Sequence, residues 1–119
     1  MNLTACIDEI LISGLDDWVD AAEVAFVAKS IGGAEGDTEN RALSVRVIRD
    51  LIMEGLVDVG DVTTECFRPW NLSVDEALKR IEHEWTSLGR WPQIGEICWL
   101  SNTEKGDMQA NDIRKLKSE

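Results

Sequence analysis

Residues 51–60 read LIMEGLVDVG, and this stretch decides the fold class of the chain. The apolar residues up to position 54 repeat at helical spacing. Gly55 then suits the left-handed position that ends a helix, because glycine adopts a positive φ without steric cost. Residues 56–59 alternate as a short strand does. A helix that passes directly into a strand predicts an α+β domain, and a chain of 119 residues has the length of one domain.

Three helices are predicted up to this junction. The first covers residues 3–13. The second begins at Asp16, whose carboxylate caps the next turn, and it ends at the glycine pair 32–33. The third covers residues 39–54 and is capped by Thr38. The first half of the domain is therefore expected to be mostly helical.

A turn at residues 60–61 and a second strand over residues 62–67 are predicted next. The clearest helix of the chain then covers residues 73–88. Ser73 and Glu76 stand at the spacing of a capping box, in which each side chain satisfies a backbone N–H of the other residue. Apolar residues continue at helical spacing from there.

The end of the chain combines one more strand with a polar segment. Residues 96–101 alternate as a strand does, and residues 102–106 have the composition of a turn. Residues 107–119 are polar and predict a C-terminal tail or a terminal helix. The single domain is therefore expected to span residues 1–106.

This order of elements resembles that of a winged helix. Residues 51–57 resemble the junction where the third helix gives way to the first wing strand, and residues 99–106 resemble the second wing strand with its exit turn. The resemblance implies a three-helix core with a small antiparallel sheet. The helix over residues 73–88 is then an insertion between the wing strands, which is a departure from the simple pattern.

Five short blocks together resemble a family of small, mostly uncharacterised bacterial proteins. The resemblance extends over residues 15–106 and implies an intracellular domain with no known activity. The small size and the acidity are also similar to those of immunity proteins from bacterial toxin systems. The blocks are DWV at 17–19, AEV at 22–24, FRPW at 67–70, DEA at 75–77 and EICWL at 96–100.

The charge of the chain is strongly acidic and unevenly distributed. Twelve basic residues stand against 23 acidic ones, so the net charge is -11. Such a balance argues against broad binding to nucleic acids or anionic membranes, since affinity for phosphates comes largely from cations. Residues 1–66 hold 14 acidic and 4 basic side chains, whereas residues 67–119 hold 9 and 8. The acidity is therefore expected to form a face on the first half.

An acidic face has two interpretations, a solvated surface that maintains solubility or a landing site for a basic partner. Asp17, Asp20 and Glu23 stand three residues apart, so we expect one exposed ridge on the second helix. Acidic residues of the following loop flank this ridge. A basic protein partner is predicted, with a nuclease toxin as the favoured class. The acidic candidates for partner binding are Asp17, Asp20, Glu23, Glu35, Asp37 and Glu39.

Five tryptophans stand out in a chain that has no tyrosine. Trp18, Trp85 and Trp99 fall on apolar stripes and are predicted to belong to the core. Trp70 and Trp91 fall in loops beside prolines, where they either pack onto the body or anchor a partner, because tryptophan is enriched at interface hot spots. These two complete the candidate partner-binding residues.

DNA binding is the alternative function, and it follows from the winged-helix order. The third helix would then enter the major groove, and an acidic balance on and around that helix opposes this interpretation. The candidate DNA contacts are Asn40, Arg41, Arg46 and Arg49.

No catalytic residue, metal site or cofactor is predicted. His83, the single histidine, has Lys79 and Ser87 at the neighbouring helical positions, so no second ligand faces it. The glycine-rich residues 32–36 lack the Lys-Ser/Thr that follows a phosphate-binding loop. A non-enzymatic binding protein is therefore expected.

A cytoplasmic location is predicted from the N-terminus and the cysteines. The first residues lack the basic region of a signal peptide, and no apolar stretch approaches the roughly 20 residues that span a bilayer. Cys6, Cys66 and Cys98 are predicted to be buried or half-buried thiols in a reducing compartment.

Overall fold

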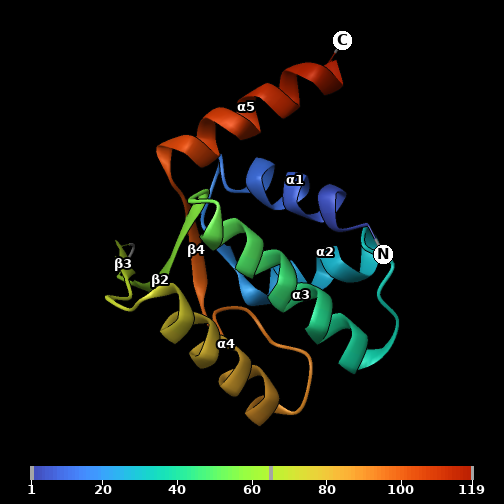
Figure 1. Ribbon diagram of the computed structural model, residues 1–119, viewed down its shortest axis with the longest axis vertical. Helices are drawn as coiled ribbons and strands as arrows, with labels where there is room; N and C mark the ends of the chain where they lie inside the picture. The colour runs from blue at the N-terminus through green and yellow to red at the C-terminus, as the bar shows by residue number, and fades with distance from the viewer. Residues whose placement is uncertain (1, 65, 119) are drawn as a thin grey trace.

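The computed structural model describes residues 2–64 and 66–118, which form an α+β fold (Figure 1). Within these residues, five helices accompany one four-stranded antiparallel sheet. The helices are α1 (Leu3–Ser13), α2 (Ala21–Ser30), α3 (Gly36–Met53), α4 (Val74–Leu88) and α5 (Glu104–Ser118). The strands are β1 (Val19–Asp20), β2 (Val57–Thr63), β3 (Cys66–Pro69) and β4 (Trp99–Asn102).

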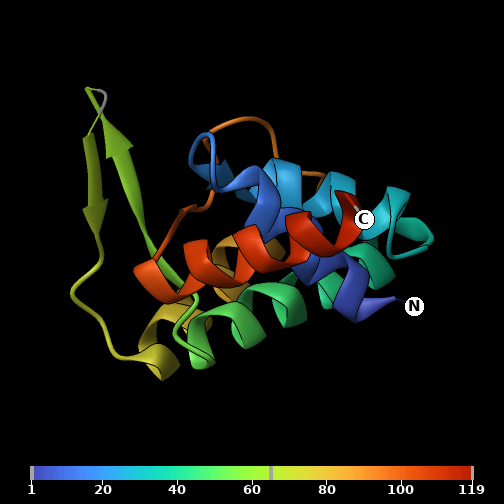
Figure 2. The same ribbon diagram turned by 90° about the horizontal axis from the view of Figure 1, so that it is seen from above.

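The sheet has the strand order β1-β4-β2-β3, so the last strand in sequence lies between the first and the second. Leu100 of β4 pairs with Val19 of β1 and with Val59 of β2. All three side chains are buried, so this row of the sheet belongs to the core. The hairpin of β2 and β3 extends away from the helices, as Figure 2 shows.

Helix α3 occupies the centre of the helical layer. It packs against α1, α2 and α4, and Figure 1 shows it between α1 and α4. Its buried face contributes Val47, Ile48 and Leu51, all fully buried. Their spacing of one, three and four residues places them on one side of the helix, as the sequence predicts.

The strongest local signals of the sequence are confirmed. Gly55 lies after α3 with φ of 71°, and β2 begins two residues later at Val57. At the start of α4, Ser73 Oγ accepts from the Glu76 N–H at 3.2 Å, and Glu76 Oε1 accepts from the Ser73 N–H at 3.1 Å. Gly89 ends that helix in the left-handed conformation. These helix boundaries are therefore predictable from short-range sequence patterns.

The predicted start of the second helix is wrong. Helix α2 begins at Ala21, because Asp20 has an extended backbone and caps the helix through its side chain. Val19 and Asp20 form the short strand β1. Its partner β4 is remote in sequence, so no local pattern indicated this strand. The third helix also differs, since α3 begins at Gly36 and its N-cap is Glu35, not Thr38.

Both predicted turns are wrong as well. Strand β2 continues through residues 60–61 as far as Thr63, because Gly60 pairs with Trp99 on one side and with Pro69 on the other. Helix α5 begins within the second predicted turn, at Glu104. It continues to Ser118 and packs against α1, so the C-terminal segment is a helix as far as the structure describes it.

The tryptophans predicted for the core differ in burial. Trp85 is buried at 3% exposure, as predicted. Trp18 and Trp99 are only half-buried, because Trp18 precedes β1 and Trp99 begins β4, outside the helical layer. Trp18 stacks on Phe67 of β3, with 6.3 Å between the ring centroids.

The five helices of the described residues are either too short or too polar to span a lipid bilayer.

Candidate partner-binding surface

Three of the predicted partner-binding residues lie together around one surface hollow of about 570 Å³. Glu35 and Asp37 come from the N-terminal end of α3, and Trp91 comes from the loop after α4. Lys29 of α2 also lines the hollow, and its Nζ lies 5.9 Å from the centroid of the Trp91 ring. The rest of the lining comes from Gly33, Ala34 and Gly36. We call this the Trp91 hollow. It combines two carboxylates with an aromatic face that already contacts one cation.

The loop that carries Trp91 is held by an ion pair between Arg90 and Glu96. Arg90 Nη1 and Nη2 donate to the two carboxylate oxygens of Glu96 at 2.7 and 2.8 Å. The Gln93 N–H also donates to Glu96 Oε1, at 2.7 Å. These hydrogen bonds, the one from Arg90 first, lower the pKa of Glu96 to about 2. Both residues position the loop, and neither was recognised in the sequence.

Asp20 fixes the same loop from the other side and is not a surface residue. It is 6% exposed, its Oδ2 accepts from the Gly95 N–H at 2.8 Å, and its Oδ1 accepts from the Glu23 N–H at 3.0 Å. Both carboxylate oxygens are therefore occupied within the fold. Asp20 positions the loop beside Trp91 and is corrected from a partner contact to an internal anchor.

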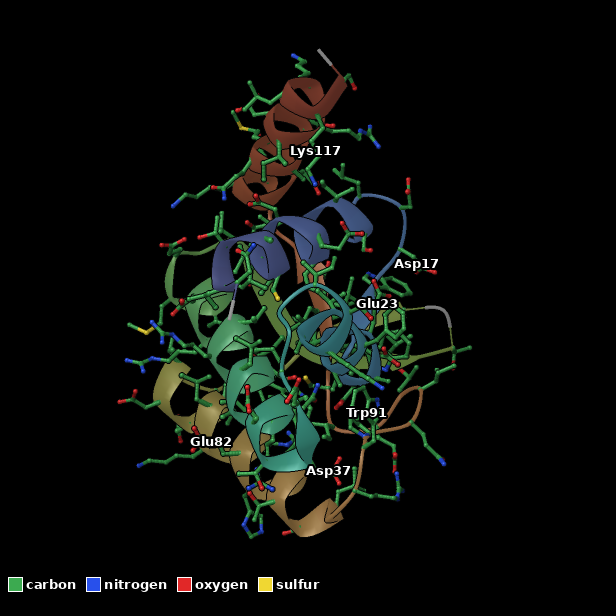
Figure 3. All side chains as sticks on the ribbon, turned by 90° about the vertical axis from the view of Figure 1, so that its right-hand side faces the viewer. Asp17, Glu23, Asp37, Glu82, Trp91 and Lys117 are labelled. Atoms are coloured by element: carbon green, nitrogen blue, oxygen red, sulfur yellow. The ribbon has the colours of Figure 1, made fainter. Side chains whose placement is uncertain are left out.

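The predicted ridge of Asp17, Asp20 and Glu23 on one helix is wrong, because α2 begins only at Ala21. Asp17 precedes β1, and its Oδ1 accepts from the Trp18 N–H at 2.7 Å. It lines a separate hollow of about 310 Å³. Figure 3 shows Asp17, Glu23 and Trp91 one below another in the right-hand half of the view, so Asp17 and Glu23 remain predicted contacts.

The two remaining candidates do not line the Trp91 hollow. Glu39 is exposed in the first turn of α3. Trp70 follows β3, and the Arg80 guanidinium of α4 lies 3.8 Å from the centroid of its ring. The backbone N–H of Trp70 also donates to the Val59 carbonyl at 3.0 Å. Trp70 therefore packs onto the body, which is one of the two alternatives that the sequence left open.

Of the four candidate DNA contacts, Asn40 is a wrong prediction, because its side chain is buried. It is 2% exposed, and its Nδ2 donates to the Ala25 carbonyl at 2.8 Å. The amide therefore joins α3 to α2 and cannot reach a base. The three arginines lie on the outer side of α3, where they line a different groove.

The three cysteines differ in their exposure to solvent. Burial raises the pKa of the Cys6 and Cys98 thiols, so both are poor nucleophiles. Cys66 is exposed, which corrects the prediction that all three thiols are buried or half-buried. No group of three His, Cys, Asp or Glu side chains suited to a metal ion occurs in residues 2–64 and 66–118.

The Trp91 hollow therefore combines two carboxylates, one ammonium group and one half-buried indole ring. No protein-family model, no curated protein and no solved structure matches the chain.

Proposed function

We propose that this protein is a non-enzymatic, immunity-type inhibitor that binds a basic toxin domain through its acidic surface, with nucleases as the favoured class of toxin. The observation that supports this proposal is the Trp91 hollow, where Glu35, Asp37 and Trp91 lie together. A lysine or arginine of the partner would stack on the indole and pair with the carboxylates. A nuclease offers such cations, because its substrate is a polyanion.

The state of the acidic side chains supports the same proposal. Between described residues, only Arg80–Glu84 and Arg90–Glu96 form ion pairs within 4.0 Å. Most carboxylates of a chain with net charge -11 are therefore uncompensated within the molecule. Complementary charge accelerates association with a basic partner and disfavours acidic ones.

We propose a winged-helix scaffold as the finer description of the fold. Three helices and β1 precede β2, and β4 occupies the position between β1 and β2. The segment of β3 and α4 is then an insertion between the two central strands. In this proposal the helical core serves as a rigid support for the loop that carries Trp91.

Charge reversal in the Trp91 hollow tests the proposed function. The double variant Glu35→Lys, Asp37→Lys is compared with Glu104→Lys, Asp112→Lys on α5, which makes the same change in net charge. Isothermal titration measures the affinity for a peptide rich in lysine and arginine, and inhibition assays use a panel of basic nuclease domains. We expect the hollow variant to weaken binding and inhibition by about tenfold or more, and the control by less than about threefold.

Two outcomes would overturn the proposal. Equal losses in both double variants would mean that net charge alone attracts the peptide. Unchanged binding in the hollow variant would exclude Glu35 and Asp37 as contacts. Trp91→Ala provides an independent check, because removal of an aromatic anchor is expected mainly to accelerate dissociation.

A further inference from the structure

A groove of about 440 Å³ between α3 and α4 is lined by more basic than acidic side chains, in contrast to the net acidity of the chain. Three arginines of α3 line it, namely Arg41, Arg46 and Arg49. Arg46 and Arg49 are exposed, whereas Arg41 is half-buried. We call this the arginine groove. In Figure 3, Glu82 of its α4 wall lies near the edge opposite Trp91.

Contacts within the described parts of the chain do not explain why three arginines occur at this place. Acidic residues outnumber basic ones by 23 to 12, yet none of the three forms an ion pair within 4.0 Å in the described parts of the chain. Basic residues at the end of a helix are stabilised by the helix dipole, as Lys115 and Lys117 are in the last turn of α5. The last turn of α3 contains no basic residue, so this explanation does not apply.

The remaining lining indicates the kind of ligand. Ala42 and Val45 of α3 add apolar surface between the arginines, and Thr86 and Glu82 come from α4. We propose that the arginine groove binds an acidic, amphipathic segment of a protein partner. Carboxylates of that segment would pair with the arginines, and its apolar side chains would contact Ala42 and Val45.

A protein segment fits this groove better than a nucleic acid does. Glu82 in the α4 wall would repel a phosphate, whereas a lysine of a protein segment can pair with it. A duplex that extends along α3 would also bring its phosphates close to acidic residues at both ends of the helix. The repulsion would be strong, because duplex DNA carries one charge per 1.7 Å of helix axis. Those residues are Asp37 and Glu39 at one end, and Asp50 and Glu54 at the other. A short segment avoids them.

This site goes beyond the proposed function, because its ligand is acidic, whereas the ligand proposed for the Trp91 hollow is basic. A smaller hollow of about 210 Å³ adjoins both sites, and Arg41 and Trp91 both line it. Arg46 and Arg49 do not line it, so substitutions of these two residues report on the arginine groove alone.

The test uses the full chain and a synthetic amphipathic peptide with glutamates on one side and leucines on the other. Its counterpart has glutamine in place of every glutamate. We expect Arg46→Glu, Arg49→Glu to weaken binding of the glutamate peptide by about tenfold or more. The matched control is Arg114→Glu, Lys117→Glu on α5, which has the same spacing and charge change and should lose less than about threefold.

Glu82→Gln distinguishes a binding effect from a folding defect, because it should strengthen binding of the glutamate peptide. Equal affinity for the glutamine peptide, or equal losses in the two double variants, would overturn the proposal. The last experiment measures binding of a labelled DNA duplex to the same variants. Duplex binding that exceeds peptide binding and is abolished by Arg46→Glu, Arg49→Glu would assign the groove to nucleic acid and also overturn the proposal.

Discussion

The carboxylate of Asp20 joins two parts of the chain that are remote in sequence. One oxygen caps α2, and the other accepts from the Gly95 N–H of the loop that carries Trp91. Sequence alone predicted an exposed acid here, since an aspartate that caps a helix is indistinguishable by residue type from one that faces solvent. Its burial depends on the loop after α4, whose path no local pattern indicates.

Asp20→Ala is expected to lower the free energy of unfolding by about 2 kcal/mol, because it removes a helix cap and leaves the Gly95 N–H without its acceptor. Urea denaturation measures this loss. The control is Asp16→Ala at a neighbouring exposed aspartate, where we expect a change of less than about 0.5 kcal/mol. Similar stability of the two variants would contradict the internal role of Asp20.

Glu96 makes the loop sensitive to acid. Its pKa is about 2 in the folded protein, below the ordinary value of 4.5, because Arg90 and the Gln93 N–H bind its charged form. A lowered pKa means that the ion pair stabilises the fold above pH 4.5, and that this contribution is lost as the pH falls from 4.5 towards 2. NMR titration of the Glu96 carboxyl carbon should give the low value, and Arg90→Gln should raise it towards 4.5.

Helix α5 is packed closely against the start of β2. At Gly106, an added Cβ would collide with the backbone carbonyl of Leu56, which cannot rotate away as a side chain would. Gly106 is therefore required by packing, although glycine is unfavourable within a helix.

Gly106→Ala is expected to destabilise the protein by about 1–3 kcal/mol through this collision. Helix propensity alone would give the opposite sign, since alanine is favoured over glycine by about 1 kcal/mol in a helix interior. Thermal unfolding followed by circular dichroism distinguishes the two. Gln109→Ala on the same helix is the control, and a stabilised Gly106→Ala variant would disprove the close packing of α5.

The elements that sequence predicted well are those whose signals are local. Helix α4 has its capping box and its terminal glycine within its own span, and its predicted bounds agree with the structure. Strand β1 has two residues and exists only because β4 pairs with it. Gly60 lies in the middle of β2 despite its turn-forming composition, because strands flank it on both sides. Long-range pairing therefore overrode the local preference.

The candidate site was predictable in its residue types and not in its grouping. Acidity and loop position selected Glu35, Asp37 and Trp91, and the structure brings these three to one hollow. Arg90 and Glu96 were missed because their pairing depends on the path of the loop between them. The sequence contains no motif from which that path follows.

At the scale of the whole molecule, charge is divided between two sites. The acidic half of the sequence supplies Glu35 and Asp37 to the Trp91 hollow, and it also supplies all three arginines of the arginine groove. A count of charges along the chain predicted only the first of these. The acids lie at the start of α3, whereas Arg46 and Arg49 lie further along the helix, and Arg41 lies between the two groups, beside the hollow that adjoins both sites.

The central place of β4 in the sheet also has a consequence for synthesis on the ribosome. Val19 emerges from the ribosome well before its partner Leu100, which follows it at a long distance in the sequence. Until then β1 has no neighbour, and the outer edge of β2 is open. Contacts between such distant residues raise the contact order and slow the final folding step. The four-stranded sheet can therefore close only after Leu100 has left the ribosome, so its completion is a late step in folding.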